Sequence, residues 1–412
     1  MGKTEPPRRA AVRILRIAGG GDGVARLDDG MTVFVPRSAP GDLVTLRDVR
    51  KRRGFARARI ADLIEAGPDR TEAPCPHYTT DSCGGCQLQH LTADAQREAR
   101  RRAVGDALRR IGKFDVEDPP IEPAPDDWAY RTRLSLHAVN GRIGLRPLDR
   151  PADAFELDRC LIADVALQDL WSRLRRLRDL LPAGLGRLSL RRSGNGVLHL
   201  LAELPAGSGW TAAPALASEL ERQGLRVILW AGPAGAQPTR VAGDADEYPA
   251  ASFEQVNPGM GARIRRDAVE ALAPQPGEEV WDLYAGIGET TALLVGLGAR
   301  VSSVESDERA VEWAKRHGPP ARRYAASVEQ ILPALVRPAS VITNPPRTGM
   351  DERAVGHLLA AGPSRVVYIS CDPATLARDL GRLRGYALAG LRAYDLFPQT
   401  AHVETVAVME RA

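Results

Sequence analysis

One cysteine lies at a point in the sequence where a nucleophile could work. Cys371 follows the β-branched and aromatic run Val366–Ile369, which is typical of a buried strand. Pro373 cannot continue a strand, so Cys371 is expected at the carboxyl end, the edge at which open α/β sheets bind their ligands. A thiol there is a candidate nucleophile, and the alternative is a buried apolar cysteine with no chemical role.

The other four of the five cysteines indicate a metal site. Three of them, Cys75, Cys83 and Cys86, have the spacing C-x7-C-x2-C, and the two glycines between the last pair allow a tight turn around one centre. Cys160 is the only other cysteine available as a fourth ligand. Four thiolates suit either a structural zinc ion or an iron–sulfur cluster, and the spacing alone does not distinguish them.

A glycine loop predicts a cofactor site. Glu279–Tyr284 is a predicted strand that runs into the loop Ala-Gly-Ile-Gly-Glu-Thr-Thr. Thr291 occupies the third glycine position of the dinucleotide fingerprint, which favours S-adenosylmethionine over a nicotinamide cofactor. A second predicted strand, Val301–Val304, ends at Glu305, where a carboxylate could bind ribose hydroxyls.

A third predicted strand, Ala339–Thr343, ends at Asn344 and should bring this amide to the same edge as Cys371. Asn344-Pro345-Pro346 by itself resembles the NPPY-type motif of amino-methylating enzymes, which have no use for a thiol. The cysteine on the next strand favours a different chemistry.

Length and charge limit the classes of protein. A chain of 412 residues, 44% apolar and 26% charged, is expected to form two or three globular domains. Residues 1–66 carry fourteen Lys and Arg against eight Asp and Glu, and residues 92–113 carry seven against three, which favours a polyanionic partner. The start of the chain lacks a signal peptide, and no apolar run of about 18 residues occurs. We therefore expect a cytoplasmic protein with no membrane contact.

The pattern along the chain predicts three domains. Short alternating strands up to about residue 66 predict a small OB-type barrel, with a basic loop at Arg47–Phe55 that could bind nucleic acid. Thr92–Phe114 is predicted as one arginine-rich helix and Pro119–Pro125 as a linker. After Ser252 strands and helices alternate, as in a doubly wound α/β fold. The predicted domains are residues 8–66, 67–251 and 252–412.

Several motifs together resemble one family. The N-terminal stretches DGVARLDDGMTVFVPRSAPGD and KRRGFARARI resemble a TRAM domain, a small RNA-binding barrel. CPHYTTDSCGGCQLQH resembles the four-iron four-sulfur motif of the bacterial 23S rRNA uracil-C5 methyltransferases. Further motifs of uracil-C5 RNA methyltransferases are matched in order by SFEQVNP, WDLYAGIGETT, NPPRTGM, SCDPATLARDL and DLFPQTAHVETVAVMER.

The resemblance implies an N-terminal TRAM barrel, a central α+β domain with an iron–sulfur motif and a Rossmann-like class I methyltransferase domain. It implies methylation of carbon 5 of a uridine in 23S rRNA by a monomer. In this family the positions of Cys371 and Glu404 are those of the nucleophile and the general base, although a lone glutamate in a strand such as 402–409 is more often a surface carboxylate. The implied cluster ligands are Cys75, Cys83, Cys86 and Cys160. The implied cofactor contacts are Gln255, Tyr284, Gly286, Glu289, Glu305, Ser327 and Asn344, and Phe253 would line the uracil pocket.

Two departures from the family pattern concern the pocket. Asn344 replaces the usual aspartate, and Ser327 is the only candidate for an adenine-side contact that is often acidic or an amide. Three other functions compete with the main hypothesis. They are the same chemistry on tRNA, a non-catalytic RNA-binding protein with a degenerate methyltransferase fold, and an amino-methylating enzyme.

Overall fold

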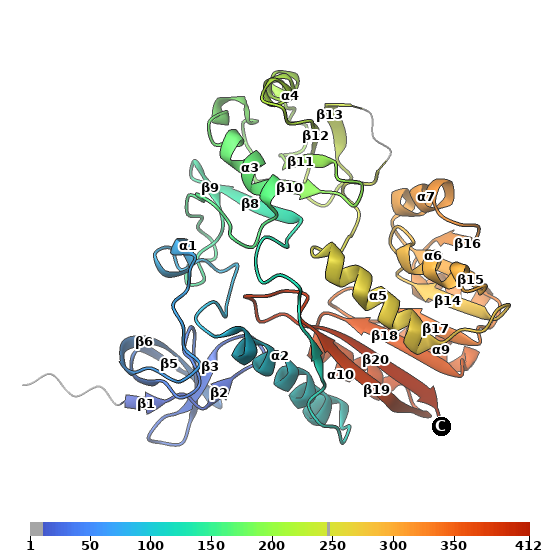
Figure 1. The fold of residues 1–412 in the computed structure, drawn as a ribbon, viewed down its shortest axis with the longest axis horizontal. Helices are drawn as coiled ribbons and strands as arrows, with labels where there is room; N and C mark the ends of the chain where they lie inside the picture. Colours follow the sequence, from blue (N-terminus) through green and yellow to red (C-terminus); the bar gives the residue numbers. More distant parts are fainter. Residues whose placement is uncertain (1–10, 245–247) are drawn as a thin grey trace, which may run out of the picture.

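The computed structural model describes residues 11–244 and 248–412. Three sheets organise this part of the chain, and Figure 1 shows the blue N-terminal strands, the green central sheet and the orange-to-red C-terminal sheet as separate groups. The C-terminal sheet carries the predicted catalytic residues, so we call it the catalytic sheet. The first ten residues, where the predicted barrel begins, lie outside the described residues. Within the described ranges, no helix combines the length and the apolar character that crossing a membrane requires.

The N-terminal sheet has six strands in the order β1-β5-β6-β4-β3-β2 and forms a half-barrel. Its strands are β1 (Ala11–Arg13), β2 (Arg16–Ile17), β3 (Gly23–Arg26), β4 (Thr32–Val35), β5 (Leu43–Arg52) and β6 (Phe55–Glu65). Alternate residues such as Val33, Val35 and Val44 fill its core.

The basic segment Arg47–Phe55 is not a loop, as the sequence suggested. Its residues extend β5 and β6 into a long hairpin, and Lys51 and Arg52 pair with Ala56 and Phe55. Gly54, at φ 86°, closes the turn. Arginine-rich strands can form here because residues 47–52 of β5 are exposed, while Ala56 and Ala58 of β6 fill the barrel core.

The central sheet has the strand order β13-β12-β11-β10-β8-β9. It consists of β8 (Arg133–Val139), β9 (Arg142–Gly144), β10 (Arg187–Arg192), β11 (Leu198–Glu203), β12 (Val227–Gly232) and β13 (Thr239–Ala242). Helices α3 (Val165–Leu174) and α4 (Ala213–Arg222) pack on it, and the short α1 (Pro76–Thr79) lies in the cysteine segment. Leu167, Leu170 and Trp171 of α3 are buried because they form the apolar stripe that faces the sheet.

The catalytic sheet has eight strands in the order β16-β15-β14-β17-β18-β20-β19-β7. Its strands are β14 (Glu279–Leu283), β15 (Arg300–Glu305), β16 (Arg322–Ala325), β17 (Ser340–Thr343), β18 (Arg365–Ser370), β19 (Tyr386–Tyr394), β20 (Glu404–Arg411) and the short β7 (Ile121–Glu122). Its helices are α5 (Pro258–Leu272), α6 (Glu289–Gly296), α7 (Glu308–His317), α8 (Val328–Ile331), α9 (Glu352–Ala361) and α10 (Pro373–Arg382). The five strands from β16 to β18 are parallel, as the alternating pattern after Ser252 predicts.

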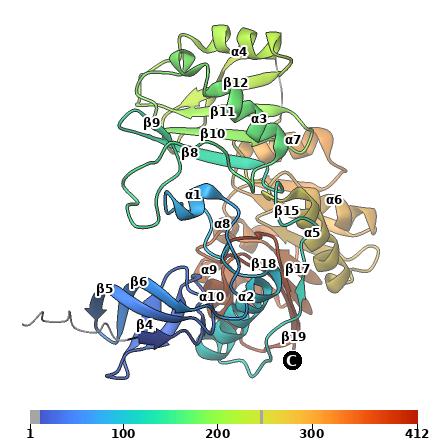
Figure 2. The same ribbon diagram turned by 60° about the vertical axis from the view of Figure 1, so that its left-hand side comes forward.

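Two segments that precede the central sheet in the chain pack on the catalytic sheet. Helix α2 (Ala93–Ala107), capped by Thr92 and continued by a π-helical turn at Leu108–Gly112, packs against α10 and β19. Figures 1 and 2 both show α2 between the half-barrel and the catalytic sheet. The proline-rich segment predicted as a linker instead supplies β7, which pairs with the edge strand β19. This pairing is possible because the prolines flank β7 and leave its backbone free to bond.

Candidate active site

Three parallel strands bring the predicted pocket residues to one edge of the catalytic sheet. Strands β14, β17 and β18 are neighbours, so Tyr284, Asn344 and Cys371, which follow them, lie at the same carboxyl edge. The Asn344 backbone N–H donates to the Leu283 carbonyl over 3.2 Å, which extends the pairing of these strands into the pocket.

Cys371 is half-buried, so its thiol is accessible. Burial and, to a smaller extent, the nearby Glu404 carboxylate together raise its pKa to about 11, against the opposing effect of the Arg347 guanidinium, which hydrogen-bonds the sulfur. Arg347 is held in place from α10, because Thr375 donates its hydroxyl to the Arg347 carbonyl over 3.0 Å. A thiolate at Cys371 therefore has a cation beside it.

Glu404 is the first residue of β20 and is almost completely buried. Because the next residue, Thr405, pairs with Ser370, Glu404 lies beside the strand end that carries Cys371. Burial raises its pKa to about 8, and Arg347 opposes this shift. Among the described residues its Oε2 has no hydrogen-bond partner. A buried, unpaired carboxyl with a pKa near neutrality is suited to moving a proton.

The glycine loop is held by Glu305, the residue predicted to bind ribose. The Gly286 N–H donates to Glu305 Oε2 over 2.9 Å, and the Asp307 N–H donates to its Oε1 over 2.9 Å. Tyr284 and Gly286 both have positive φ, of 60° and 55°. The loop therefore turns sharply at the sheet edge, and the carboxylate fixes that turn.

Thr291, which replaces the third glycine of the dinucleotide fingerprint, has a specific partner. Its hydroxyl donates to Asp282 Oδ2 over 2.5 Å, and both side chains are buried. Burial raises the pKa of Asp282 to about 7, and the Thr291 hydrogen bond opposes this. This position thus stabilises the strand-to-helix turn instead of allowing a close approach of pyrophosphate.

One cavity next to the glycine loop brings together most of the predicted cofactor contacts. Its lining includes Gln255, Tyr284, Gly286, Glu289 and Asn344, together with the exposed ring of Phe253. Glu289 pairs with Arg265 of α5 at 2.5 Å, and burial raises its pKa while Arg265 opposes the shift.

Ser327 lies outside the lining of this cavity. It caps α8 just after β16, which pairs with β15 next to Glu305. Its hydroxyl is buried and has no hydrogen-bond partner among the described residues. An adenine edge could satisfy such a hydroxyl, so Ser327 remains a predicted contact.

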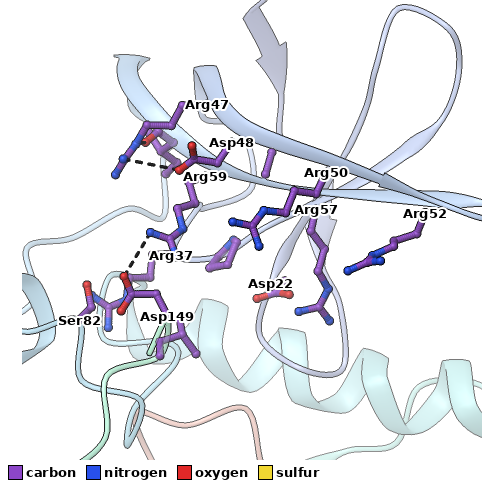
Figure 3. Close-up of a pocket in the computed structure, with 14 residues that line it drawn as sticks. Asp22, Arg37, Arg47, Asp48, Arg50, Arg52, Arg57, Arg59, Ser82 and Asp149 are labelled. Atoms are coloured by element: carbon purple, nitrogen blue, oxygen red, sulfur yellow. Dashed lines mark hydrogen bonds and ion pairs between the residues drawn. The ribbon is translucent and has the colours of Figure 1, made fainter. Parts of the chain in front are cut away.

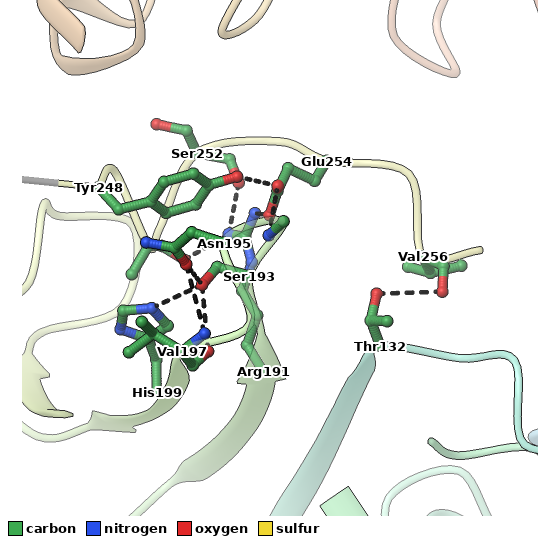
Figure 4. A network of polar contacts seen from close by, with 12 residues as sticks. Thr132, Arg191, Ser193, Asn195, Val197, His199, Tyr248, Ser252, Glu254 and Val256 are labelled. Atoms are coloured by element: carbon green, nitrogen blue, oxygen red, sulfur yellow. Dashed lines mark hydrogen bonds and ion pairs between the residues drawn. The ribbon is translucent and has the colours of Figure 1, made fainter. Parts of the chain in front are cut away.

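The segment that carries Phe253 and Gln255 is anchored to the central sheet. Figure 4 shows Arg191 of β10 reaching this segment, where it donates to the carbonyls of Ala250 and Ser252 and pairs with Glu254. The Thr132 N–H also donates to the Val256 carbonyl over 2.8 Å. Arg191 and Glu254 thus position a segment of the pocket, and no local sequence pattern marks either residue for that role.

All four predicted ligand cysteines line one cavity, together with Arg347 and His402 from the catalytic domain. Their thiols are mutual neighbours, because Cys75 and Cys160 both raise the pKa of Cys83, and the Gly85 N–H donates to Cys83 Sγ over 3.4 Å. Yet no three His, Cys, Asp or Glu side chains in residues 11–244 and 248–412 are arranged to hold a single metal ion. The cavity nevertheless brings together the four thiols that the sequence predicts as ligands.

A basic groove runs along the half-barrel. Figure 3 shows arginines of β5 and β6 around it, and its lining includes Arg47, Arg50, Arg52, Arg57 and Arg59. Arg59 pairs with Asp149 of the central domain at 3.2 Å, and Asp22 is half-buried beneath Arg57. Arg50 and Arg52 have no ion-pair partner in the part of the chain that the structure describes, so their charge faces the groove.

Comparison with known proteins gives the family. The profile of the tRNA (Uracil-5-)-methyltransferase family matches residues 328–412, which include Cys371 and Glu404. The 23S rRNA (uracil(1939)-C(5))-methyltransferase RlmD of Alkalilimnicola ehrlichii is 33% identical over 95% of this chain and 94% of that protein. The chain belongs to the RNA (uracil-C5)-methyltransferase family.

Two further relatives extend the likeness over the whole chain. An RNA methyltransferase of Streptomyces avermitilis is 31% identical over 97% of this chain and 98% of that protein. The fold resembles the Pyrococcus abyssi tRNA (uracil-54, C5)-methyltransferase, solved with S-adenosyl-L-homocysteine, with a TM-score of 0.74 and 24% identity over 97% of this chain and 99% of that one. The family is S-adenosylmethionine-dependent, and the multidomain α/β architecture predicted from the sequence is confirmed in its half-barrel and Rossmann-like parts.

Proposed function

We propose that this methyltransferase modifies carbon 5 of a uridine in 23S rRNA through a covalent adduct between Cys371 and carbon 6 of the base. The observation that carries the proposal is the meeting of an accessible thiol, a guanidinium and a buried carboxyl at the edge that also holds the cofactor loop. This set provides a nucleophile, a charge that stabilises it and a base.

Cys371 starts the reaction. After its thiol proton is lost to solvent, the thiolate next to Arg347 adds to carbon 6 of the uracil, and electrons move through carbon 5 to the carbonyl oxygen at carbon 4. Carbon 5 becomes nucleophilic as a result. S-adenosylmethionine supplies the electrophilic methyl group that carbon 5 accepts.

Glu404 completes the reaction by removing the proton from carbon 5. The electrons of that C–H bond re-form the 5,6 double bond and expel the Cys371 thiolate. Burial beside Cys371 suits Glu404 to this step, because its raised pKa makes it a stronger base than an exposed carboxylate.

The target base must leave its stack to reach Cys371. The exposed ring of Phe253 offers a surface on which a flipped uracil could stack. The basic groove of the half-barrel supports binding of the surrounding RNA, since Arg50 and Arg52 can contact phosphates while the catalytic site takes a single nucleotide.

The cysteine cavity offers four thiolate donors, which suit either a zinc ion or an iron–sulfur cluster. The resemblance of this segment to the motif of the 23S rRNA uracil-C5 methyltransferases favours the cluster. Cys75, Cys83, Cys86 and Cys160 would hold it, and its function would be to fix this segment in place.

The cysteine motif favours rRNA over tRNA as the substrate, because it resembles that of the 23S rRNA enzymes, and the RlmD relatives at 31% and 33% identity support the same substrate. The rival is the same chemistry on tRNA, which is the substrate named for the Pyrococcus abyssi relative of similar fold.

The experiment uses total RNA from a strain that lacks the gene. The purified protein is incubated with this RNA and a labelled methyl donor, and the labelled RNA is separated and mapped. We expect label at carbon 5 of uridine in 23S rRNA. Label confined to tRNA would overturn the rRNA assignment, and absence of label from protein with a full complement of iron would overturn the enzymatic proposal.

A Glu404→Gln variant tests the mechanism. It should still form the Cys371 adduct but release it about 10²- to 10⁴-fold more slowly, because the carbon 5 proton stays in place. The adduct is measured as RNA-linked protein on a denaturing gel. Normal turnover by this variant would exclude Glu404 as the base.

A further inference from the structure

The loop 395–403 leads directly into Glu404 and is tied to parts of the molecule far away in sequence. It connects β19 to β20, and in Figure 1 this red segment extends away from its sheet toward the cysteine segment. Asp395, Gln399 and Thr400 are buried in it. A loop of nine residues is ordinarily exposed and mobile. The burial of these three polar side chains therefore needs an explanation.

Gln96 of α2 makes the most specific contact with this loop. Its Nε2 donates to Gln399 Oε1 over 2.9 Å, and the Gln399 backbone N–H donates back to Gln96 Oε1 over 2.9 Å. Both side chains are about 95% buried or more. Gln399 has φ 69°, a left-handed conformation that is costly without a compensating interaction. The paired amides provide that interaction.

The cysteine segment holds the same residue from the other side. The backbone N–H groups of Gln87 and Leu88, directly after Cys86, both donate to the Gln399 carbonyl, over 3.1 and 3.0 Å. The Gln87 side chain also accepts from the Ala401 N–H over 3.3 Å. The position of the loop is thus fixed relative to the cysteine cavity.

A buried ion pair holds the start of the loop. Arg100 of α2 pairs with Asp395 at 2.8 Å, with both side chains 1% exposed, and its Nη1 donates to the Thr400 carbonyl over 2.7 Å. Arg100 is one of the arginines of the helix that the sequence predicts as arginine-rich. Its burial shows that one face of this basic helix is used to hold the loop.

We propose that Gln96, Arg100 and the Gln87-Leu88 amides form a clamp that positions Glu404 for proton removal. Glu404 is the first residue of its strand, and a strand end frays unless the preceding chain is held. The Glu404 carboxyl has no hydrogen bond at Oε2 that would orient it. Its position therefore depends on the backbone, which the ladder fixes on one side and the clamp on the other. The inference rests on the proposed role of Glu404.

The test compares two glutamine substitutions of the same kind. Gln96→Leu removes the amide pair from the loop. The matched control is Gln168→Leu on α3. Gln168 donates to the Ala163 carbonyl five residues back, just as Gln96 donates to the Leu91 carbonyl. Within the described part of the chain, Gln168 makes no hydrogen bond to the loop 395–403. Each variant is assayed for kcat, for the KM of RNA and for the fraction of protein held in the covalent RNA adduct.

Misplacement of the general base Glu404 should change the kinetics in a distinctive way. Gln96→Leu should lower kcat about ten- to a hundredfold with the KM of RNA within about twofold, while the adduct fraction rises, because addition of Cys371 precedes the step that fails. Gln168→Leu should match the wild type in all three. An adduct fraction that falls in parallel with kcat, or an unchanged kcat, would overturn the clamp.

A second substitution guards against a folding failure of Gln96→Leu. Gln399→Gly removes the side-chain acceptor of Gln96 Nε2 and keeps the backbone N–H that donates to Gln96 Oε1, and glycine adopts the left-handed conformation without cost. It should also raise the adduct fraction, and a decrease would count against the clamp. If neither the wild type nor Glu404→Gln forms an adduct, the proposed function fails, and this outcome is distinct from a failure of the clamp.

Discussion

Cys371 and the four ligand cysteines lie in different electrostatic surroundings. Burial raises the thiol pKa at Cys371 and at Cys83 alike, to about 11 and about 12. The other neighbours differ, because the Arg347 guanidinium hydrogen-bonds the Cys371 sulfur, whereas Cys83 has two other thiols beside it that would repel its negative charge, with the Gly85 N–H and the charge of Arg37 opposing them. One arginine can stabilise a transient thiolate, while a group of four thiolates needs a metal centre. These surroundings support the proposal that the same residue type is a nucleophile in one place and a ligand in the other.

Substitution of Cys371 should cause the largest loss of activity. We expect Cys371→Ala to lower methyl transfer at least about 10⁴-fold and to abolish the covalent adduct, because nothing else can add to carbon 6. Iron content should equal that of the wild type, which separates the two kinds of cysteine. Retained turnover, followed as transfer of labelled methyl to RNA, would refute the covalent mechanism.

Substitution of Cys86 should change the iron content, which substitution of Cys371 is expected to leave unchanged. Cys86→Ala should lose iron, and with it the visible absorbance of the protein, and should melt at a lower temperature, because binding of the metal centre stabilises the fold. Any activity that remains should still depend on Cys371. Unchanged iron content would exclude Cys86 as a ligand.

Removal of the charge beside Cys371 should have a smaller effect. Arg347→Met should raise the pKa of the thiol and slow its alkylation by iodoacetamide about tenfold at pH 7, a factor that corresponds to a shift of about one unit. Arg353→Met is the control, since Arg353 pairs with Asp351 on the surface. Mass spectrometry of the Cys371 peptide gives the rate, and equal rates in both variants would assign the thiol's reactivity to another group.

The pH dependence should be the mildest effect. Glu404 has a pKa of about 8, so it is mostly protonated at pH 7 and gains its base form as the pH rises. Decay of the covalent adduct should accelerate up to about tenfold per pH unit below 8 and level off above it. Quenched single-turnover assays between pH 6 and 9 measure the decay rate of the adduct. A rate that falls with pH would contradict a role for Glu404 as base.

Much of the catalytic sheet follows from local sequence. Strands such as β14, β17 and β18 are short apolar runs that end in glycine, proline or polar residues, so the residues at their ends could be identified directly. The prediction of a basic loop at 47–55 was wrong, because hairpin pairing compensates for poor strand propensity. The proline-rich linker also proved to include a strand, since an edge position tolerates flanking prolines.

The sequence by itself determined which side chains can carry the chemistry, because strand ends and cysteine spacing are local properties. Only the tertiary structure decided what surrounds them. Arg347 reaches Cys371 from another strand end, and Gln96 meets Gln399 across 303 positions of sequence. The pairing of buried polar groups depends on how separate segments pack together, and no local pattern encodes which partner each of them finds.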